Sequence, residues 1–182
     1  MKIVAISGSL RAASSNTALV RVAIASAPAG IDAVLYDGLG DLPHFSPELD
    51  PPDSVKHLRA LLASADGVLL CTPEYAYGIP GSLKNALDWL VFSGELWRKP
   101  VAVLSASPSA RGGEYAHAAL SLTLSALEAA VVEAASLQIP FMATKLNAEK
   151  EVSDPATLAA LGASLAALIA AVEEQARQGA RK

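Results

Sequence analysis

The hydrophobic pattern of the chain alternates between short apolar runs and longer stretches with helical periodicity. The apolar runs predict strands, because each is only a few residues long and is bounded by polar residues, glycine or proline. They lie at residues 3–6, 31–36, 67–72 and 101–105 and within 134–141. The run at 67–72 is apolar up to its last residue, which is typical of a central strand covered on both faces of a parallel sheet.

Helical periodicity follows the strands, and it is clearest at the end of the chain. There Asp154 and Pro155 suit the N-cap and the first helical position, and an apolar stripe follows at Leu158, Leu161, Leu165, Leu168 and Val172. In the helix predicted at 82–90, Lys84 and Asp88 are spaced to pair. The residues expected to face the sheet are Leu83, Ala86, Leu87, Leu90 and Val91. For Trp89, near Phe92 and Trp97, we favour an oligomer contact over a covered core edge.

Five alternations of strand and helix predict an α/β fold. We expect a three-layer, doubly wound, five-stranded parallel sheet with helices on both faces. Residues 1–182 should form a single domain, since this length suits one sizeable core. In such sheets, ligands bind at the carboxyl ends of the strands, near the point where the strand order reverses. The loops after the first, third and fourth strands should therefore carry the chemistry.

The composition excludes several classes of protein. A hydrophobic content of 52% with 18% charged residues excludes a disordered chain. A net charge of −4 disfavours non-specific binding of nucleic acid. The single cysteine excludes an intramolecular disulfide and suits a reducing cytosol. No apolar run approaches the roughly 18 residues that span a bilayer, and no signal peptide is evident, so we expect a soluble cytoplasmic protein.

The loop after the first strand, residues 7–17, combines glycine, hydroxyl and amide side chains with one arginine and no acid. A helix opens at about Asn16, so the N–H groups of the loop and the positive helix end would converge on one point, which predicts a phosphate site. The side chains able to bond an anion are Ser9, Arg11, Ser14, Asn16 and Thr17. Capping of the helix explains Ser14, Ser15 and Asn16 equally well.

Other phosphate-binding loops have patterns that this loop lacks. Leu10 and Ala13 stand where a dinucleotide-binding loop needs glycine, and no Gly-Lys-Ser/Thr ending marks a P-loop. The only cysteine, Cys71, lies far away in the sequence at the end of a buried strand, where core packing is expected rather than redox chemistry. The loop is therefore predicted to hold a phosphate without attacking it.

The loops after the third and fourth strands suit a flat ligand. Residues 72–82 hold two prolines and two glycines that fix the backbone, together with two tyrosines, which suits a heteroaromatic ring. Residues 105–113 are mostly small, as close approach to a ligand requires, although an ordinary turn has the same composition. For Glu74, a salt bridge at a subunit contact is at least as expected as a catalytic role. His57 and His117 lie on predicted helices, and neither is expected to be functional.

These motifs resemble the NADPH-dependent FMN reductase family, which includes quinone, chromate and azo-dye reductases. The resemblance is carried by Ser9-x-Arg11-x-x-Ser14-x-Asn16, by Pro73-Glu74-Tyr75 and by Pro80-Gly81-x-Leu83-Lys84-Asn85-Ala86-x-Asp88-Trp89, and it extends from Met1 to at least Gln138. It implies a flavodoxin-like fold that holds FMN, usually in a homodimer or homotetramer. The implied cofactor-binding residues are Ser9, Arg11, Ser14, Ser15, Asn16 and Thr17 at the phosphate and Pro73, Glu74, Tyr75, Ala76, Ser105 and Ser107 at the ring.

Three positions depart from the family pattern. The family usually has Asn where this chain has Ala76, so one side-chain hydrogen bond to the flavin is absent. The family often has arginines that join subunits where this chain has Tyr115 and Ser121, which puts the tetramer in doubt more than the dimer.

The resemblance also implies an activity. NADPH or NADH would pass a hydride to the flavin, which would reduce quinones, free flavin, azo compounds or metal oxyanions. The chemistry belongs to the cofactor, so we expect no catalytic side chain and no metal, and the partners should be small molecules rather than nucleic acid or membrane. The alternatives are an electron carrier of the flavodoxin type, which binds FMN without oxidising NAD(P)H itself, and a binding module for a phosphorylated ligand. The acceptor, the choice between NADPH and NADH, and the assembly size stay open.

Overall fold

The central sheet is built from the predicted apolar runs in the computed structural model, which describes residues 1–179. Its strands are β1 (Lys2–Ser7), β2 (Asp32–Tyr36), β3 (Gly67–Thr72), β4 (Pro100–Ala106), β5 (Ala130–Val131) and β6 (Leu137–Ile139). All neighbouring strands are parallel, in the order β2-β1-β3-β4-β5, and β6 also pairs with β4. The strand order therefore reverses between β1 and β3, in the middle of the sheet.

The fifth position of the sheet is shared by two short strands. β5 pairs with the first two residues of β4, β6 pairs with Leu104–Ala106 at its end, and the 3₁₀ turn η2 (Glu133–Ala135) separates them. The strand predicted within 134–141 corresponds to β6. β5 is not predicted from the sequence, because its two residues are too few to form a hydrophobic pattern. The predicted parallel, doubly wound α/β sheet is confirmed.

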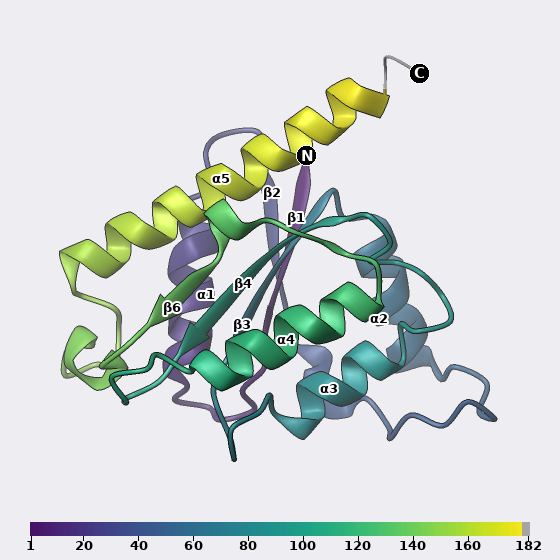
Figure 1. Cartoon of the computed structure of the whole chain (residues 1–182), viewed down its shortest axis with the longest axis horizontal. Coiled ribbons are helices and arrows are strands. Elements are labelled where there is room, and N and C mark those ends of the chain that lie inside the picture. The colour runs from purple at the N-terminus through teal and green to yellow at the C-terminus, as the bar shows by residue number, and fades with distance from the viewer. Residues whose placement is uncertain (180–182) are drawn as a thin grey trace.

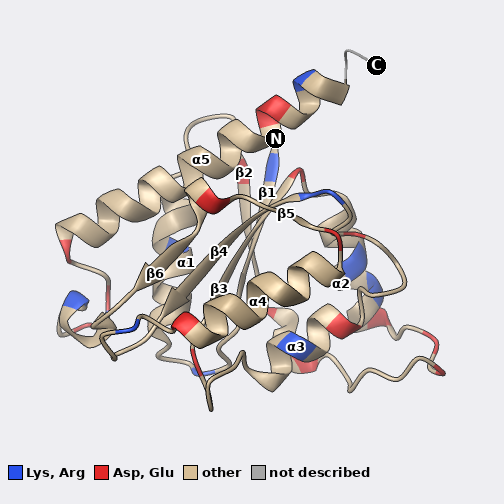
Figure 2. Cartoon of the chain, viewed as in Figure 1, with Lys and Arg blue, Asp and Glu red and all other residues tan. Residues whose placement is uncertain are grey.

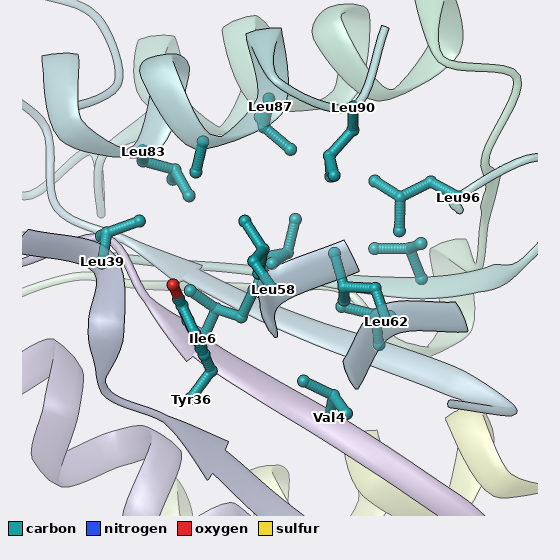
Figure 3. Packing of buried hydrophobic residues seen from close by; sticks show 14 of the residues in the cluster. Val4, Ile6, Tyr36, Leu39, Leu58, Leu62, Leu83, Leu87, Leu90 and Leu96 are labelled. Carbon is teal, nitrogen blue, oxygen red and sulfur yellow. The ribbon is translucent and has the colours of Figure 1, made fainter. Parts of the chain in front are cut away.

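Helices cover both faces of this sheet (Figure 1). They are α1 (Ser15–Ala25), α2 (Asp53–Ala63), α3 (Gly81–Asp88), α4 (Glu114–Ala126) and α5 (Pro155–Gly179). α1 and α5 pack on one face, and α2, α3 and α4 pack on the other. On the second face, leucines of α2 and α3 meet Val4 and Ile6 of β1 (Figure 3). Each fully buried leucine contributes about 1.5–3 kcal/mol, so these two layers hold the carboxyl ends of the strands in place.

Most helical predictions hold in detail. The Asp154 carboxylate caps α5 by accepting a hydrogen bond from the Thr157 backbone N–H at 2.9 Å, as the sequence predicts. The predicted Lys84–Asp88 pair forms, with 2.5 Å between Nζ and Oδ1. Two predicted core positions are wrong, because Leu158 and Val91 are exposed. The apolar stripe of α5 begins one turn later than expected, and Val91 lies beyond the end of α3.

Trp89 is a core residue, so the predicted oligomer contact at this position is wrong. Its side chain is 1% exposed, and its indole Nε1–H donates to the Pro43 carbonyl at 2.8 Å. The ring of Phe45 meets it edge to face, with centroids 5.2 Å apart. The loop at 38–53, which is irregular after the 3₁₀ turn η1 (Gly38–Asp41), supplies both partners. The Asn85 side chain fixes this loop by accepting from the Phe45 N–H and donating to the Pro43 carbonyl.

Helix α5 contradicts the expectation that no apolar stretch approaches 18 residues. Within the described part of the chain, it is the one helix whose length and composition would allow it to cross a membrane, and residues 155–172 carry no charge. In the structure, α5 lies against α1 and the sheet, and Leu161, Leu165 and Leu168 are buried in that layer. Packing in the core therefore accounts for the buried apolar residues of α5.

Candidate functional site

Three loops meet at the carboxyl edge of the sheet, where the strand order reverses. The backbone N–H of Gly8, just after β1, donates to the Cys71 carbonyl in β3 at 2.8 Å. The loop after β3 is bonded to the start of α4, which follows β4. The structure therefore brings together the three loops that the sequence selects. We name residues 7–17 the phosphate end and residues 73–78 and 105–116 the ring end, after the ligand groups that the sequence predicts there.

At the phosphate end, the helix-capping interpretation holds for Ser14. Its side chain accepts a hydrogen bond from the Thr17 N–H at 3.3 Å, and Ser14 is the N-cap of α1. The Thr17 hydroxyl donates to the Ser7 hydroxyl at 2.8 Å, and the buried Asn16 side chain accepts from the Cys71 thiol at 3.2 Å. Burial raises the pKa of the Cys71 thiol, which fits the predicted packing role. These side chains therefore fix the shape of the loop.

The same end retains the features of an anion site. Among residues 1–179, the backbone N–H groups of Ser15 and Asn16, in the first turn of α1, have no hydrogen-bond partner. Such groups at a helix start attract anions. Arg11, four residues before Ser15, is exposed, and no acid lies within residues 7–17. A Cβ at Gly8 would lie 2.9 Å from Cδ2 of Leu83, so a larger residue there would displace the buried Leu83 side chain.

At the ring end, the loop after β3 closes in a tight hairpin turn. The N–H groups of Tyr75 and Gly78 donate to each other's carbonyls at 3.0 and 2.9 Å. Ala76 and Tyr77, between them, have φ values of +48° and +59°. This left-handed conformation is costly for residues with a side chain, by about 1–2 kcal/mol each. Pro73 is buried, whereas Tyr75 and Ala76 are exposed at the tip.

Glu74 caps helix α4 from a distant part of the sequence. Its Oε2 accepts hydrogen bonds from the backbone N–H groups of Tyr115 and Ala116, at 2.9 and 3.1 Å. The N-cap position of α4 itself is Gly113, which has no side chain to serve this purpose. The carboxylate also complements the positive end of the helix. Glu74 therefore joins the loop after β3 to the helix after β4, a role that neither sequence-based alternative described.

A further contact joins the same two segments, and others fix the start of α4. The rings of Tyr77 and Tyr115 meet edge to face, with centroids 5.0 Å apart. The guanidinium of Arg111 donates to the Tyr115 hydroxyl at 2.6 Å and pairs with Glu114 at 2.9 Å. Sequence reasoning gave no site role to Arg111 or Tyr115. One feature of the sequence could have indicated such contacts. The Gly112-Gly113 pair stands directly before a predicted helix and leaves that helix without a capping side chain of its own.

Ser105 and Ser107 support the loop after β4. The buried Ser105 hydroxyl donates to the Gly112 carbonyl at 2.8 Å, and its oxygen lies 3.3 Å from Nδ1 of His117. Because the hydroxyl proton is used by Gly112, Nδ1 of His117 must carry a proton and donate to Ser105. Ser107 accepts from the Ser109 N–H through its hydroxyl and is bonded to Ile139 and Met142 through its backbone.

No group of three or more His, Cys, Asp or Glu side chains within residues 1–179 is arranged to hold a metal ion.

The predicted site residues lie in two neighbouring regions at one edge of the sheet. Ser9, Arg11, Ser14, Ser15, Asn16 and Thr17 form the phosphate end, and Pro73, Glu74, Tyr75, Ala76, Ser105 and Ser107 belong to the ring end. Four further residues of the ring end were missed: Tyr77, Arg111, Tyr115 and, as a support of Ser105, His117.

Known proteins share this architecture. The model of the NADPH-dependent FMN reductase family matches residues 1–144. A quinone reductase of Escherichia coli (strain K12) is 32% identical over 174 residues, 92% of this chain and 93% of that protein. An NADPH azoreductase of a Bacillus species is 40% identical over 116 residues, 62% of each chain. The structure of FerB, a flavoenzyme NAD(P)H:(acceptor) oxidoreductase of Paracoccus denitrificans, superposes with a TM-score of 0.84 and 31% identity over 95% of this chain and 97% of FerB. The chain belongs to the NADPH-dependent FMN reductase family.

Proposed function

We propose that this member of the NADPH-dependent FMN reductase family binds FMN and transfers a hydride from NADPH or NADH to a small-molecule acceptor. The acceptor classes are quinones, free flavin, azo compounds and metal oxyanions. The observation that carries the proposal is the phosphate end, where two N–H groups at the start of α1 have no hydrogen-bond partner among residues 1–179. Arg11 precedes them by four residues, and residues 7–17 contain no acid. An anionic phosphate fits this set of donors.

The residues of the chain bind and orient the cofactor. Residues 9–17 would hold the phosphate of FMN, and Pro73, Glu74 and Tyr75 would lie against its ring, with Ser105 and Ser107 near the ring. Bound FMN supplies a ring that accepts and releases a hydride. Tyr75, which is exposed at the tip of its loop, would help to orient the ring, and the small residues of the loop after β4 would allow a second ligand to approach it closely. No side chain is needed as an acid or base.

The absorption spectrum of the purified protein tests this proposal. We expect a visible flavin band, either as isolated or after addition of FMN, and we expect NADPH to bleach it under nitrogen. Steady-state oxidation of NADPH should then depend on an added quinone. Bound FMN without NADPH oxidation would favour the electron carrier of the flavodoxin type. A protein that stays colourless after incubation with FMN would contradict both functions.

We also propose a cytoplasmic homodimer or homotetramer. The outward face of α4 supports an assembly, because Tyr115, Ala118, Leu122 and Ser125 are exposed along one stripe. From residue 115 to residue 127 the chain has no Lys, Arg, Asp or Glu, and Figure 2 shows the helix free of such charge beyond Glu114. An uncharged, exposed helix face is typical of an interface. Leu122→Lys should therefore shift the protein toward monomers in light scattering. A molecular mass in solution equal to that of the unmodified protein would exclude this face of α4 as the interface.

A further inference from the structure

The thiol of Cys71 makes a hydrogen bond to a residue of the phosphate end. Cys71 is the penultimate residue of β3, where it pairs in register with Ser7 of β1, and its carbonyl accepts from the Gly8 N–H at 2.8 Å. Its Sγ lies 3.2 Å from Oδ1 of Asn16, in the first turn of α1, and both side chains are buried. Neither the sequence motifs nor the proposed FMN reaction gives this contact a role.

The amide of Asn16 is only half used by the contacts of the chain. Asn16 is 4% exposed, and its Oδ1 accepts the hydrogen bond from the Cys71 thiol. Its Nδ2 has no hydrogen-bond partner within residues 1–179, yet every fully buried side-chain nitrogen and oxygen among these residues has one. Nδ2 is therefore open to solvent or to a ligand, although the rest of the side chain is buried.

This free amide group belongs to the same helix start as the free backbone donors. The backbone N–H groups of Ser15 and Asn16 have no partner within residues 1–179, and Nδ2 of Asn16 adds two further N–H bonds. Donors of this kind at the start of a helix suit an anion. The orientation of one side chain thus decides how many donors the phosphate end can offer.

The thiol determines that orientation. An Asn amide has a donor end and an acceptor end, and a half-turn of the amide group exchanges them. Because a thiol donates a hydrogen bond and its sulfur is only a weak acceptor, the amide oxygen faces Cys71 and the NH₂ group faces away. The reverse orientation would direct the oxygen away from Cys71 and repel an anion. Burial raises the pKa of the Cys71 thiol, so the thiol keeps the proton that this bond requires.

We propose that Cys71 is a positioning residue for the flavin phosphate, because its thiol holds the Asn16 amide with Nδ2 free to bind the phosphate. The inference rests on the proposed function, since it assumes that FMN binds at the phosphate end. Packing by Cys71 would support the loop equally for any flavin. The orientation of the Asn16 amide, by contrast, matters only to a flavin that carries a phosphate.

The test compares the Kd for FMN with the Kd for riboflavin, which has no phosphate, by calorimetry on the flavin-free full-length protein. Cys71→Ala removes the donor and should raise the Kd for FMN about three- to ten-fold, while the Kd for riboflavin stays within about two-fold. Cys71→Ser keeps a hydroxyl donor and should recover most of the FMN affinity. An unchanged ratio of the two Kd values in Cys71→Ala, or a Cys71→Ser variant as weak as Cys71→Ala, would overturn the inference.

Leu69→Val is the matched control for packing. Leu69 lies two residues earlier in β3 and in the same buried layer as Cys71, so this change removes one methylene and no hydrogen-bonding group. The ratio of the two Kd values should stay within about two-fold of that of the unmodified protein. A change in this ratio as large as that in Cys71→Ala would show that packing alone controls the phosphate end, and would also overturn the inference.

A double-mutant cycle tests the same contact with FMN alone. In Asn16→Ala the amide is absent, so the further change Cys71→Ala should raise the Kd for FMN by less than about two-fold. If the effects of the two changes are fully additive, Cys71 does not act through Asn16 and the inference fails while the proposed function stands. If the unmodified protein does not bind FMN, the proposed function and this inference fail together.

Discussion

The two ends of the candidate site are held together in different ways. At the phosphate end, the side-chain contacts are mostly local, such as Ser14 with Thr17 and Thr17 with Ser7, and Arg11 stands exposed at its side. At the ring end, Glu74 reaches across 41 residues to Tyr115, and Tyr77 packs on the same residue. The phosphate end is thus one short loop whose free N–H groups can bind a ligand. The ring end, by contrast, is held together by contacts between two loops and a helix. Changes at the first end should therefore affect ligand binding, and changes at the second should affect folding as well.

Glu74→Ala should have the largest effect on stability. It leaves the N–H groups of Tyr115 and Ala116 without an acceptor and removes a negative charge from the helix start. Hydrogen bonds to a charged group contribute about 1.5–3 kcal/mol, so we expect a loss of about 3 kcal/mol in the free energy of unfolding. Denaturation by urea measures it.

Glu74→Gln is the matched control for this change. It keeps an oxygen acceptor and removes the charge, so it should recover more than half of the loss. If both variants are as stable as the unmodified protein, the helix cap does not hold the ring end together.

Arg11→Ala should separate binding from folding. The side chain of Arg11 has no hydrogen bond or ion pair within residues 1–179, so the free energy of unfolding should be unchanged. If Arg11 holds the phosphate, FMN binding should weaken by about 1.5–3 kcal/mol. Calorimetric titration checks this, with riboflavin, which has no phosphate, as the control ligand. An equal FMN Kd for both proteins would remove Arg11 from the site.

The contrast between local and long-range contacts also explains which features of the site can be predicted from the sequence. The loop at 7–17 is predictable because its strand, its polar residues and its helix start are consecutive. The same holds for the sheet, whose strands are apolar runs. The cap of α4 by Glu74 is not predictable, since only the fold brings residues 74 and 115 together. The prediction of an oligomer contact at Trp89 is wrong for the same reason. The residues that cover Trp89, Pro43 and Phe45, lie in a loop that has no periodic pattern in the sequence.

Ala76→Gly should stabilise the ring end modestly. Ala76 has a φ of +48° within the turn between Tyr75 and Gly78, and glycine adopts this conformation without a steric penalty. Relief of the strain outweighs the greater freedom of glycine in the unfolded chain, so we expect a gain of about 0.5–1 kcal/mol. Asn tolerates this region better than most residues, so Ala76→Asn should gain less, and Ala76→Val should lose stability. Thermal unfolding ranks the three variants, and the reverse order would show that the turn is not strained.

Through His117, the ring end should make the free energy of unfolding depend slightly on pH. Burial lowers the pKa of the His117 imidazole, and the nearby Glu133 only partly opposes this. Below about pH 6.5, the usual value for histidine, the unfolded chain binds the proton before the folded one does. Stability is therefore retained above that pH and is lost as the pH falls from 7 toward 5. In His117→Gln, where an amide N–H can replace the donor to Ser105, this part of the slope should vanish. Urea denaturation at several pH values measures it, and parallel slopes for the two proteins would mean that His117 does not titrate on unfolding.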